Sequence, residues 1–132
     1  MCGIVGLYLK NAELQSQLGS MFKPMLVEMS SRGPDSAGVA IYRNPVESSQ
    51  IKLSLAHSNP GFLWETLGTN LSTSLNCEVS TSTVATHCIL ITDAAETEVI
   101  SWLQTNHTEV RIVGSGKSIE IFKEVGPPEI VY

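Results

Sequence analysis

A chain of 132 residues is long enough for one domain, or for one domain with a small insertion. Its net charge of -5 and its 8 scattered basic residues argue against nucleic acid or an anionic membrane as the main partner. The 3 cysteines include no Cys-x-x-Cys pair, which argues against a disulfide framework or a zinc site and indicates a reducing, cytoplasmic setting. The apolar start is too short for a membrane span and lacks the basic lead-in of a signal peptide.

The first element, Cys2 to Leu9, is rich in apolar and β-branched residues, which predicts a buried strand. If Met1 is removed, Cys2 carries a thiol and a free α-amine, which together make a nucleophile with its own base. Their ordinary pKa values, about 8.5 and about 7.7–8, let both groups exchange protons near neutral pH. The alternative is a small apolar residue packed in a strand, as most free cysteines are.

A helix is predicted next. Asn11 is suited to cap it, and apolar residues follow at steps of three and four: Leu14, Leu18, Met21, Phe22, Met25 and Met29. Pro24 removes a backbone donor, so we expect a kink or a break there. The run Ser31 to Gly38 ends the helix, and Val39 to Tyr42 alternates as a strand. Within that run, Arg32 lies near two compact acceptors, Asp35 and Ser36. This arrangement fits either a plain turn or a charged anchor near a reactive centre.

The middle of the chain alternates strand and helix patterns. Ile51 to His57 reads as a strand, and Asn59-Pro60 is expected to start a helix whose apolar face includes Trp64. The remaining predictions are a weak strand at Asn76–Ser80, a strong strand at Thr83–Thr92, a helix started by an Asp93/Glu96 capping box, and a strand at Val110–Val113. The order β-α-β-β-α-β matches the split ferredoxin-like unit, which we place at residues 50–114.

Two short motifs together resemble the start of a class II (N-terminal nucleophile, Ntn) glutamine amidotransferase domain. They are Met-Cys-Gly-Ile-Val-Gly at residues 1–6 and Arg-Gly-Pro-Asp-Ser-Ala-Gly at 32–38. The run Val113 to Gly126 is similar to the amidotransferase-like subunit of N-methylglutamate synthase, a relative of the glutamate synthase amidotransferase domain. The resemblance implies partial αββα layers at residues 1–49 and a truncated return strand at 115–132. Together with the ferredoxin-like βαββαβ insertion that the pattern predicts at 50–114, these parts give an expected α+β fold.

The activity implied by this resemblance is hydrolysis of glutamine to glutamate and ammonia, with the ammonia passed to a synthase-type partner subunit. Cys2 matches the catalytic nucleophile of the family. Arg32, Gly33, Asp35 and Ser36 match the supporting motif near that nucleophile. No metal and no cofactor are expected.

The chain also departs from the family pattern. His57, His87 and His107 are not followed by Thr-Arg, the motif whose arginine holds the substrate carboxylate. The Asn-Gly pair of the oxyanion hole and the Gly-Asp element that selects glutamine by its amine are missing too. Loss of a single oxyanion donor costs about 10²–10³ in rate. We therefore expect the chain to be the N-terminal part of an amidotransferase domain, inactive on its own.

Other interpretations stay open. One is a non-catalytic interaction or ligand-sensing module derived from an amidotransferase, and another is an N-terminal nucleophile hydrolase that acts on a different amide. The apolar end, Ile130 to Tyr132, fits either a truncated core or a homo-oligomer that covers it. Gly116-Lys117-Ser118 resembles the end of a phosphate-binding loop, but Arg111 occupies the position of its first glycine, so we expect a turn between strands.

Overall fold

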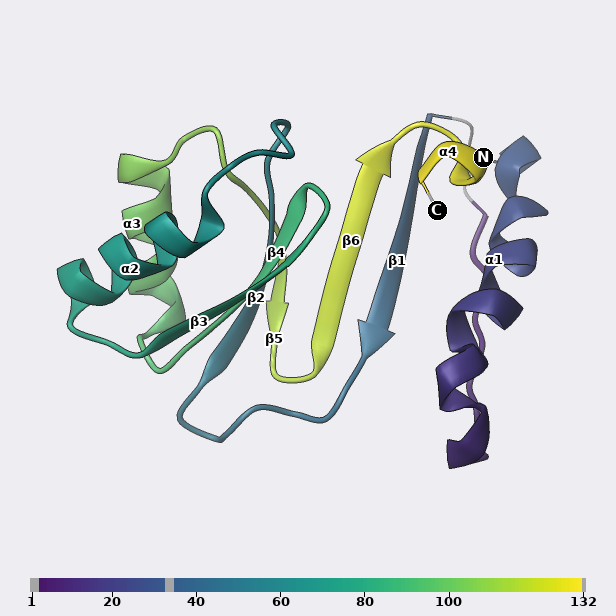
Figure 1. Cartoon of the computed structure of the whole chain (residues 1–132), viewed down its shortest axis with the longest axis horizontal. Coiled ribbons are helices and arrows are strands. Elements are labelled where there is room, and N and C mark those ends of the chain that lie inside the picture. The colour runs from purple at the N-terminus through teal and green to yellow at the C-terminus, as the bar shows by residue number, and fades with distance from the viewer. Residues whose placement is uncertain (1–2, 33–34, 132) are drawn as a thin grey trace. The chain divides into compact units, whose positions relative to one another are not determined.

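The computed structural model describes residues 3–32 and 35–131, without the side chains of Ile130 and Val131. Cys2, Gly33 and the apolar side chains at the C-terminal end therefore lie outside the described residues. The chain divides into two compact units: unit 1 comprises residues 1–38 and 123–132, and unit 2 comprises residues 39–122. Helices and two β-sheets make up the structure, which confirms the predicted α+β class (Figure 1). The smaller sheet pairs β1 (Ser36–Tyr42) with β6 (Ile119–Val125).

Unit 1 is built around one irregular helix. The Asn11 side chain accepts a hydrogen bond from the Glu13 N–H at 3.0 Å, so it caps the first turns as predicted. Pro24 lies inside an α-helix that continues to Val27, so the helix does not break there, and of the two predicted outcomes only a kink stays open. Pro24 and Ser20 are both exposed, and water can therefore satisfy the Ser20 carbonyl that the proline leaves without a donor. The helical elements of unit 1 are η1 (Ala12–Gln17), α1 (Leu18–Val27), η2 (Ser30–Arg32) and α4 (Pro128–Val131).

The N-terminal segment differs from its prediction. Residues 3–10 have no regular secondary structure, and Ile4 and Tyr8 are 95% and 84% exposed, so the expected buried strand is wrong. Burial nevertheless alternates along the segment, since Val5, Leu7 and Leu9 are half-buried while the residues between them are exposed. A strand also needs a partner for its backbone N–H and C=O groups, and no described strand pairs with this segment.

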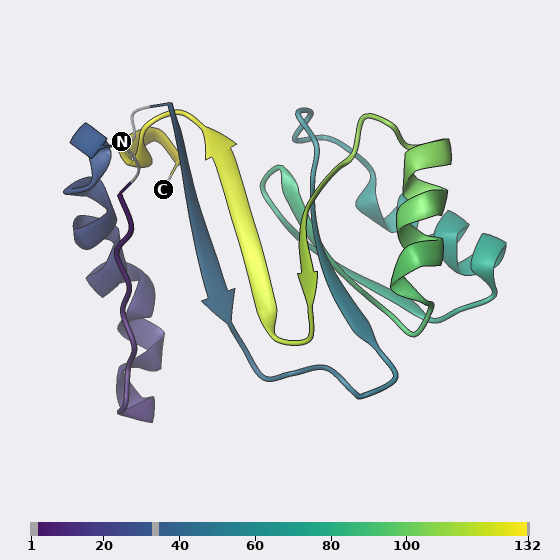
Figure 2. The ribbon, with the colours of Figure 1, turned by 180° about the vertical axis from the view of Figure 1, so that it is seen from behind.

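Unit 2 contains the predicted βαββαβ order. The strands form an antiparallel sheet in the order β3-β4-β2-β5, which is the arrangement of the split ferredoxin-like unit. Both helices lie on one side of this sheet, as the front and back views show (Figures 1 and 2). In chain order the elements are β2 (Ile51–Ala56), α2 (Trp64–Leu75), β3 (Val79–Val84), β4 (His87–Thr92), α3 (Glu96–Asn106) and β5 (Arg111–Gly116).

The core of unit 2 lies between the two helices and one face of the sheet. Alternate residues of the central strands point into it, as the period of two requires. Trp64 begins α2 in this core and is only 2% exposed. The fully buried members are Leu53, Leu55, Leu67, Leu71, Cys88, Leu90, Val99 and Leu103. Burial of these apolar side chains stabilises unit 2, because it removes their surface from water.

Three predicted element boundaries in unit 2 are wrong for local reasons. Asn59 does not cap α2; its side chain accepts from the Gly61 N–H at 2.9 Å and forms a turn before the helix. The strand expected over residues 83–92 is split by a two-residue turn at Ala85 and Thr86, between paired residues Val84 and His87. The carboxylate of Asp93 accepts from the Glu78 N–H at 2.8 Å, so it does not form the expected capping box.

The connection between β5 and β6, which belong to different sheets, depends on glycines where the two strands approach each other. A Cβ at Gly114 would lie 2.5 Å from Cδ1 of Ile121, and one at Gly116 would lie 2.8 Å from Cγ2 of Ile119. The absence of these two side chains lets β6 pack closely against β5. Gly116-Lys117-Ser118 is thus a turn between strands, as predicted. The Lys117 ammonium donates to the carbonyl of Ser48 at 2.8 Å and also to that of Gln50.

Candidate functional site

Three of the predicted site residues, Arg32, Asp35 and Ser36, lie at or beside the ends of short elements in unit 1, while Cys2 and Gly33 lie outside the described residues. Arg32 is the last residue of η2, and its N–H donates to the Met29 carbonyl at 2.9 Å. Ser36 is the first residue of β1, and the Asp35 carbonyl accepts from the Gly126 N–H at 3.0 Å. Asp35 and Ser36 are exposed, as is Arg32.

The structure brings the residue after Cys2 against the arginine of the second motif. A Cβ placed at Gly3 would lie 3.2 Å from Cβ of Arg32 and 3.2 Å from Sδ of Met29. Such contacts are tight for any side chain, so glycine allows the N-terminal backbone to pass closely over the end of η2. The two motifs, about thirty residues apart in the sequence, therefore meet at Gly3 and Arg32.

A hydrogen-bonded serine holds the helix end beside this motif. The Ser30 hydroxyl lies 2.5 Å from the Val27 carbonyl and 2.6 Å from a carboxylate oxygen of Glu129. The hydrogen bond from Ser30 lowers the pKa of the Glu129 carboxyl below its usual value. Ser30 thus joins the end of α1 to α4, so residues from both ends of the chain support the segment that leads to Arg32.

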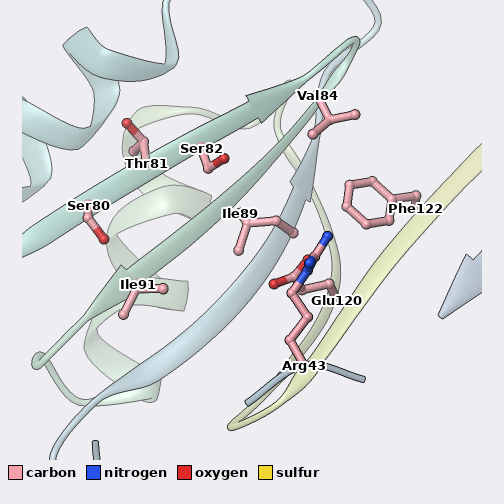
Figure 3. A pocket seen from close by; sticks show the side chains of 9 residues that line it. All are labelled: Arg43, Ser80, Thr81, Ser82, Val84, Ile89, Ile91, Glu120 and Phe122. Atoms are coloured by element: carbon pink, nitrogen blue, oxygen red, sulfur yellow. The ribbon is translucent and has the colours of Figure 1, made fainter. Parts of the chain in front are cut away.

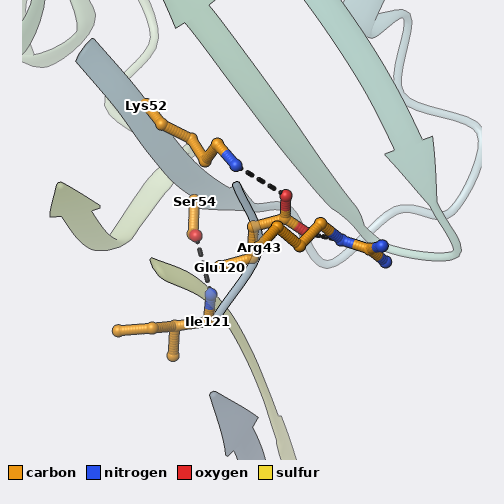
Figure 4. Close-up of polar contacts among 5 residues, drawn as sticks. All are labelled: Arg43, Lys52, Ser54, Glu120 and Ile121. Carbon is orange, nitrogen blue, oxygen red and sulfur yellow. Dashed lines mark hydrogen bonds and ion pairs between the residues drawn. The ribbon is translucent and has the colours of Figure 1, made fainter. Parts of the chain in front are cut away.

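A second polar cluster, in unit 2, was not predicted. The buried carboxylate of Glu120 binds Lys52 Nζ at 2.8 Å through one oxygen and Arg43 Nε at 2.9 Å through the other (Figure 4). Burial by itself would raise the pKa of Glu120, but the hydrogen bonds from Lys52 and Arg43 outweigh it and lower the pKa. Because these residues are far apart in sequence, no local spacing could have revealed the cluster.

The described cysteines and histidines do not gather in one site, although His57 and His107 both contact Phe62. Burial raises the pKa of the Cys88 thiol to about 11, against a smaller opposing effect of the Ser82 backbone N–H, so this side chain stays protonated near neutral pH. His57 stacks on Phe62 with ring centroids 4.2 Å apart, and His107 Nδ1 lies 3.2 Å from a carboxylate oxygen of Glu109.

Among residues 3–32 and 35–131, no three His, Cys, Asp or Glu side chains are grouped as metal ligands. None of the described helices has the length and apolar character needed to cross a membrane.

Comparison with known proteins gives one informative similarity. No family model matches the chain, and no solved structure matches it. The chain is 39% identical to the glutamine amidotransferase-like protein GlxB of Rhizobium meliloti (strain 1021), over 132 residues. The alignment covers 99% of this chain but 43% of the length of that relative. This similarity supports an amidotransferase-like family for the chain.

Proposed function

We propose that the chain carries the nucleophile-bearing part of a class II glutamine amidotransferase domain, related to that of N-methylglutamate synthase and glutamate synthase. The complete domain hydrolyses glutamine to glutamate and ammonia, and a synthase-type partner consumes the ammonia. The observation that carries this proposal is the 39% identity to a glutamine amidotransferase-like protein over nearly the whole chain. The cysteine at position 2, where removal of Met1 exposes it, supports the same reaction.

The chemistry assigned to Cys2 follows from its two functional groups. The α-amine accepts the thiol proton as sulfur attacks the γ-amide carbon of glutamine, and the proton then passes to the leaving nitrogen, which departs as ammonia. Water next attacks the thioester and releases glutamate, which restores the thiol. Both steps need the α-amine on Cys2 itself, because an amide nitrogen there has no useful basicity. Removal of Met1 is therefore a requirement of the proposal.

Arg32, Gly33, Asp35 and Ser36 are assigned a supporting role. The close approach of Gly3 to Arg32 is compatible with this role, since the residue beside the nucleophile passes over the end of η2. The Arg32 side chain is exposed, so its guanidinium is available to an anionic partner. The segments that would hold the substrate carboxylate and the oxyanion have no counterpart in this sequence, so the complete site requires residues from elsewhere.

The test is covalent labelling with a glutamine-analogue electrophile, 6-diazo-5-oxo-L-norleucine, on the processed protein as its gene encodes it. Intact mass should first show that Met1 is absent. Peptide mapping should then place the label on Cys2 in preference to Cys77 and Cys88, and glutamine should protect Cys2 from labelling.

Two controls make the result specific. Cys2→Ser should remove the label, and a lysine inserted between Met1 and Cys2 should retain the thiol but abolish selective labelling, because the α-amine is displaced. If the three cysteines label equally in the processed protein, or if glutamine gives no protection, the assignment of Cys2 as the nucleophile is wrong.

A second candidate function is a non-catalytic ligand-sensing module. The observation that favours it is that unit 2 has a ferredoxin-like strand order and a buried core of its own. Processed protein that releases no ammonia from glutamine, and whose Cys2 is no more reactive than Cys77, would favour this function over the enzyme.

A further inference from the structure

The face of the unit 2 sheet that is turned away from α2 and α3 is only partly covered. Strand pairing places Ser80, Ile91 and Lys52 in one row across this face, and Ser82, Ile89 and Ser54 in the next. Residues 119–122 of β6 cover the β2 and β5 side, where the Ile121 N–H donates to Ser54 Oγ at 2.8 Å. The β3 and β4 side is left as a hollow of about 320 Å³.

The hollow combines an apolar floor with a polar rim (Figure 3). Ile89 and Ile91 from β4 form the floor, and Phe122 from β6 lines one side. Ser80 and Ser82 stand on the exposed strand β3, and neither hydroxyl has a partner among the described residues. A mostly apolar lining with a few polar groups, at this volume, is typical of small-molecule sites.

The charge at the rim favours an anion. Glu120 carries one negative charge, while Lys52 and Arg43 carry two positive charges, so the cluster has a net charge of +1. Lys52 is buried with its ammonium on Glu120, but the Arg43 side chain is 61% exposed and binds Glu120 only through Nε. No described group bonds its Nη1 and Nη2 atoms. These atoms form the planar fork that suits a carboxylate.

We propose that this hollow binds a small carboxylic acid with a compact apolar body. The carboxylate lies on the free edge of the Arg43 guanidinium, with Ser80 and Ser82 as further donors, and the apolar body covers Ile89 and Ile91. A single net positive charge above an apolar floor favours a monoanionic carboxylate over phosphate, which carries more charge and needs more donors. The site lies wholly within unit 2 and does not depend on the proposed chemistry of Cys2.

The test is a titration of isotope-labelled protein followed by amide chemical shifts. The probes are 3-methylbutanoate and the uncharged 3-methylbutanamide, which have nearly the same shape. The acid should give saturable shifts at the backbone N–H groups of Ser82 and Ile89. The uncharged 3-methylbutanamide should bind at least about tenfold more weakly, because it has no charge to pair with the Arg43 guanidinium.

Variants of the site separate its parts. Arg43→Gln should weaken binding of the acid at least about tenfold, and Arg43→Lys should recover only part of it because the fork is lost. Ser82→Phe should block the hollow without changing the ion pairs of Glu120. Lys23→Gln, which removes a positive charge from α1, is the matched control and should bind the acid as the unchanged protein does.

Three results would overturn the proposal. The acid and the amide could bind equally, or Arg43→Gln could bind the acid as well as the unchanged protein does. Inorganic phosphate could also shift the same amides at lower concentration than the acid, which would show that the anion class is wrong. Each variant is first shown to be folded by its tryptophan fluorescence, since Trp64 lies in the core of the same unit.

Discussion

The ion-pair cluster of unit 2 leads to a specific prediction about stability. Glu120→Gln keeps the shape of the side chain but removes the negative charge between Lys52 and Arg43. Lys52 is 3% exposed, so its ammonium cannot turn into water when its partner is lost. Breaking a buried pair by removing one member costs about 3–5 kcal/mol, because an uncompensated charge remains inside.

The two cations should contribute unequally to this loss. The Arg43 side chain is 61% exposed, so solvent screens its ion pair, which contributes at most about 1 kcal/mol. Nearly all of the predicted loss therefore arises at Lys52. The double variant Lys52→Met with Glu120→Leu replaces the pair by apolar groups of similar size, and should lie within about 1–2 kcal/mol of the unchanged protein. The single variant should therefore be clearly less stable than the double variant, because only the single variant leaves the Lys52 charge buried without a partner.

The assay is urea unfolding followed by tryptophan fluorescence at several pH values. The folded-state pKa of Glu120 lies below its ordinary value of 4.5, so its contribution is fully present above pH 4.5 and is lost as the pH falls through the folded-state pKa. The loss caused by Glu120→Gln should therefore be largest near pH 7 and shrink at lower pH. A loss below about 1 kcal/mol at pH 7, or one that does not depend on pH, would refute the reasoning.

Three further predictions concern single positions of unit 2. Gly114→Ala should lower the free energy of unfolding, measured by urea unfolding, by about 1–3 kcal/mol, because the new Cβ meets Cδ1 of Ile121. In an Ile121→Val background, which lacks that Cδ1, the same substitution should cost clearly less. Equal losses in the two backgrounds would contradict this prediction. Ala85→Gly should raise the free energy of unfolding by about 0.5–1 kcal/mol, seen as a higher melting temperature, because the Ala85 backbone is left-handed, with a φ of 51°. At pH 8 a thiol reagent should modify half-buried Cys77 before buried Cys88, because a pKa of about 11 keeps the Cys88 thiol protonated. Mass spectrometry that finds Cys88 modified first in the folded protein would disprove this.

The sequence was most informative where side-chain periodicity reflects burial. The alternation of Ile51, Leu53 and Leu55 predicted β2, and the spacing around Trp64 predicted the buried face of α2. The βαββαβ order could therefore be predicted before any tertiary contact was known.

The misses come from features that leave no local pattern. The β3–β4 turn contains no glycine, proline or asparagine. Its alanine, Ala85, adopts a left-handed conformation that is uncommon for alanine, so the sequence gives no sign of the turn. Lys52 stands between the apolar residues of β2, and only the folded chain shows that Glu120, far along the sequence, binds its ammonium. Exposure of Ile4 likewise reflects the lack of a described strand paired with the N-terminal segment, and the residue itself carries no sign of this. The role of Cys2 stays a prediction from the motifs.

The division of the chain also has a consequence for the order of folding. Residues 1–38 and 123–132 form unit 1, yet all of unit 2 separates them in the sequence. Closing an unfolded loop of roughly 80 residues costs about 4 kcal/mol in chain entropy. The Arg43 N–H donates to the Ser118 carbonyl at 3.0 Å, so folding of unit 2 already brings its two ends together. Unit 2 should therefore fold first, and pulse-labelling hydrogen exchange should protect its central strands before the N–H groups of α1.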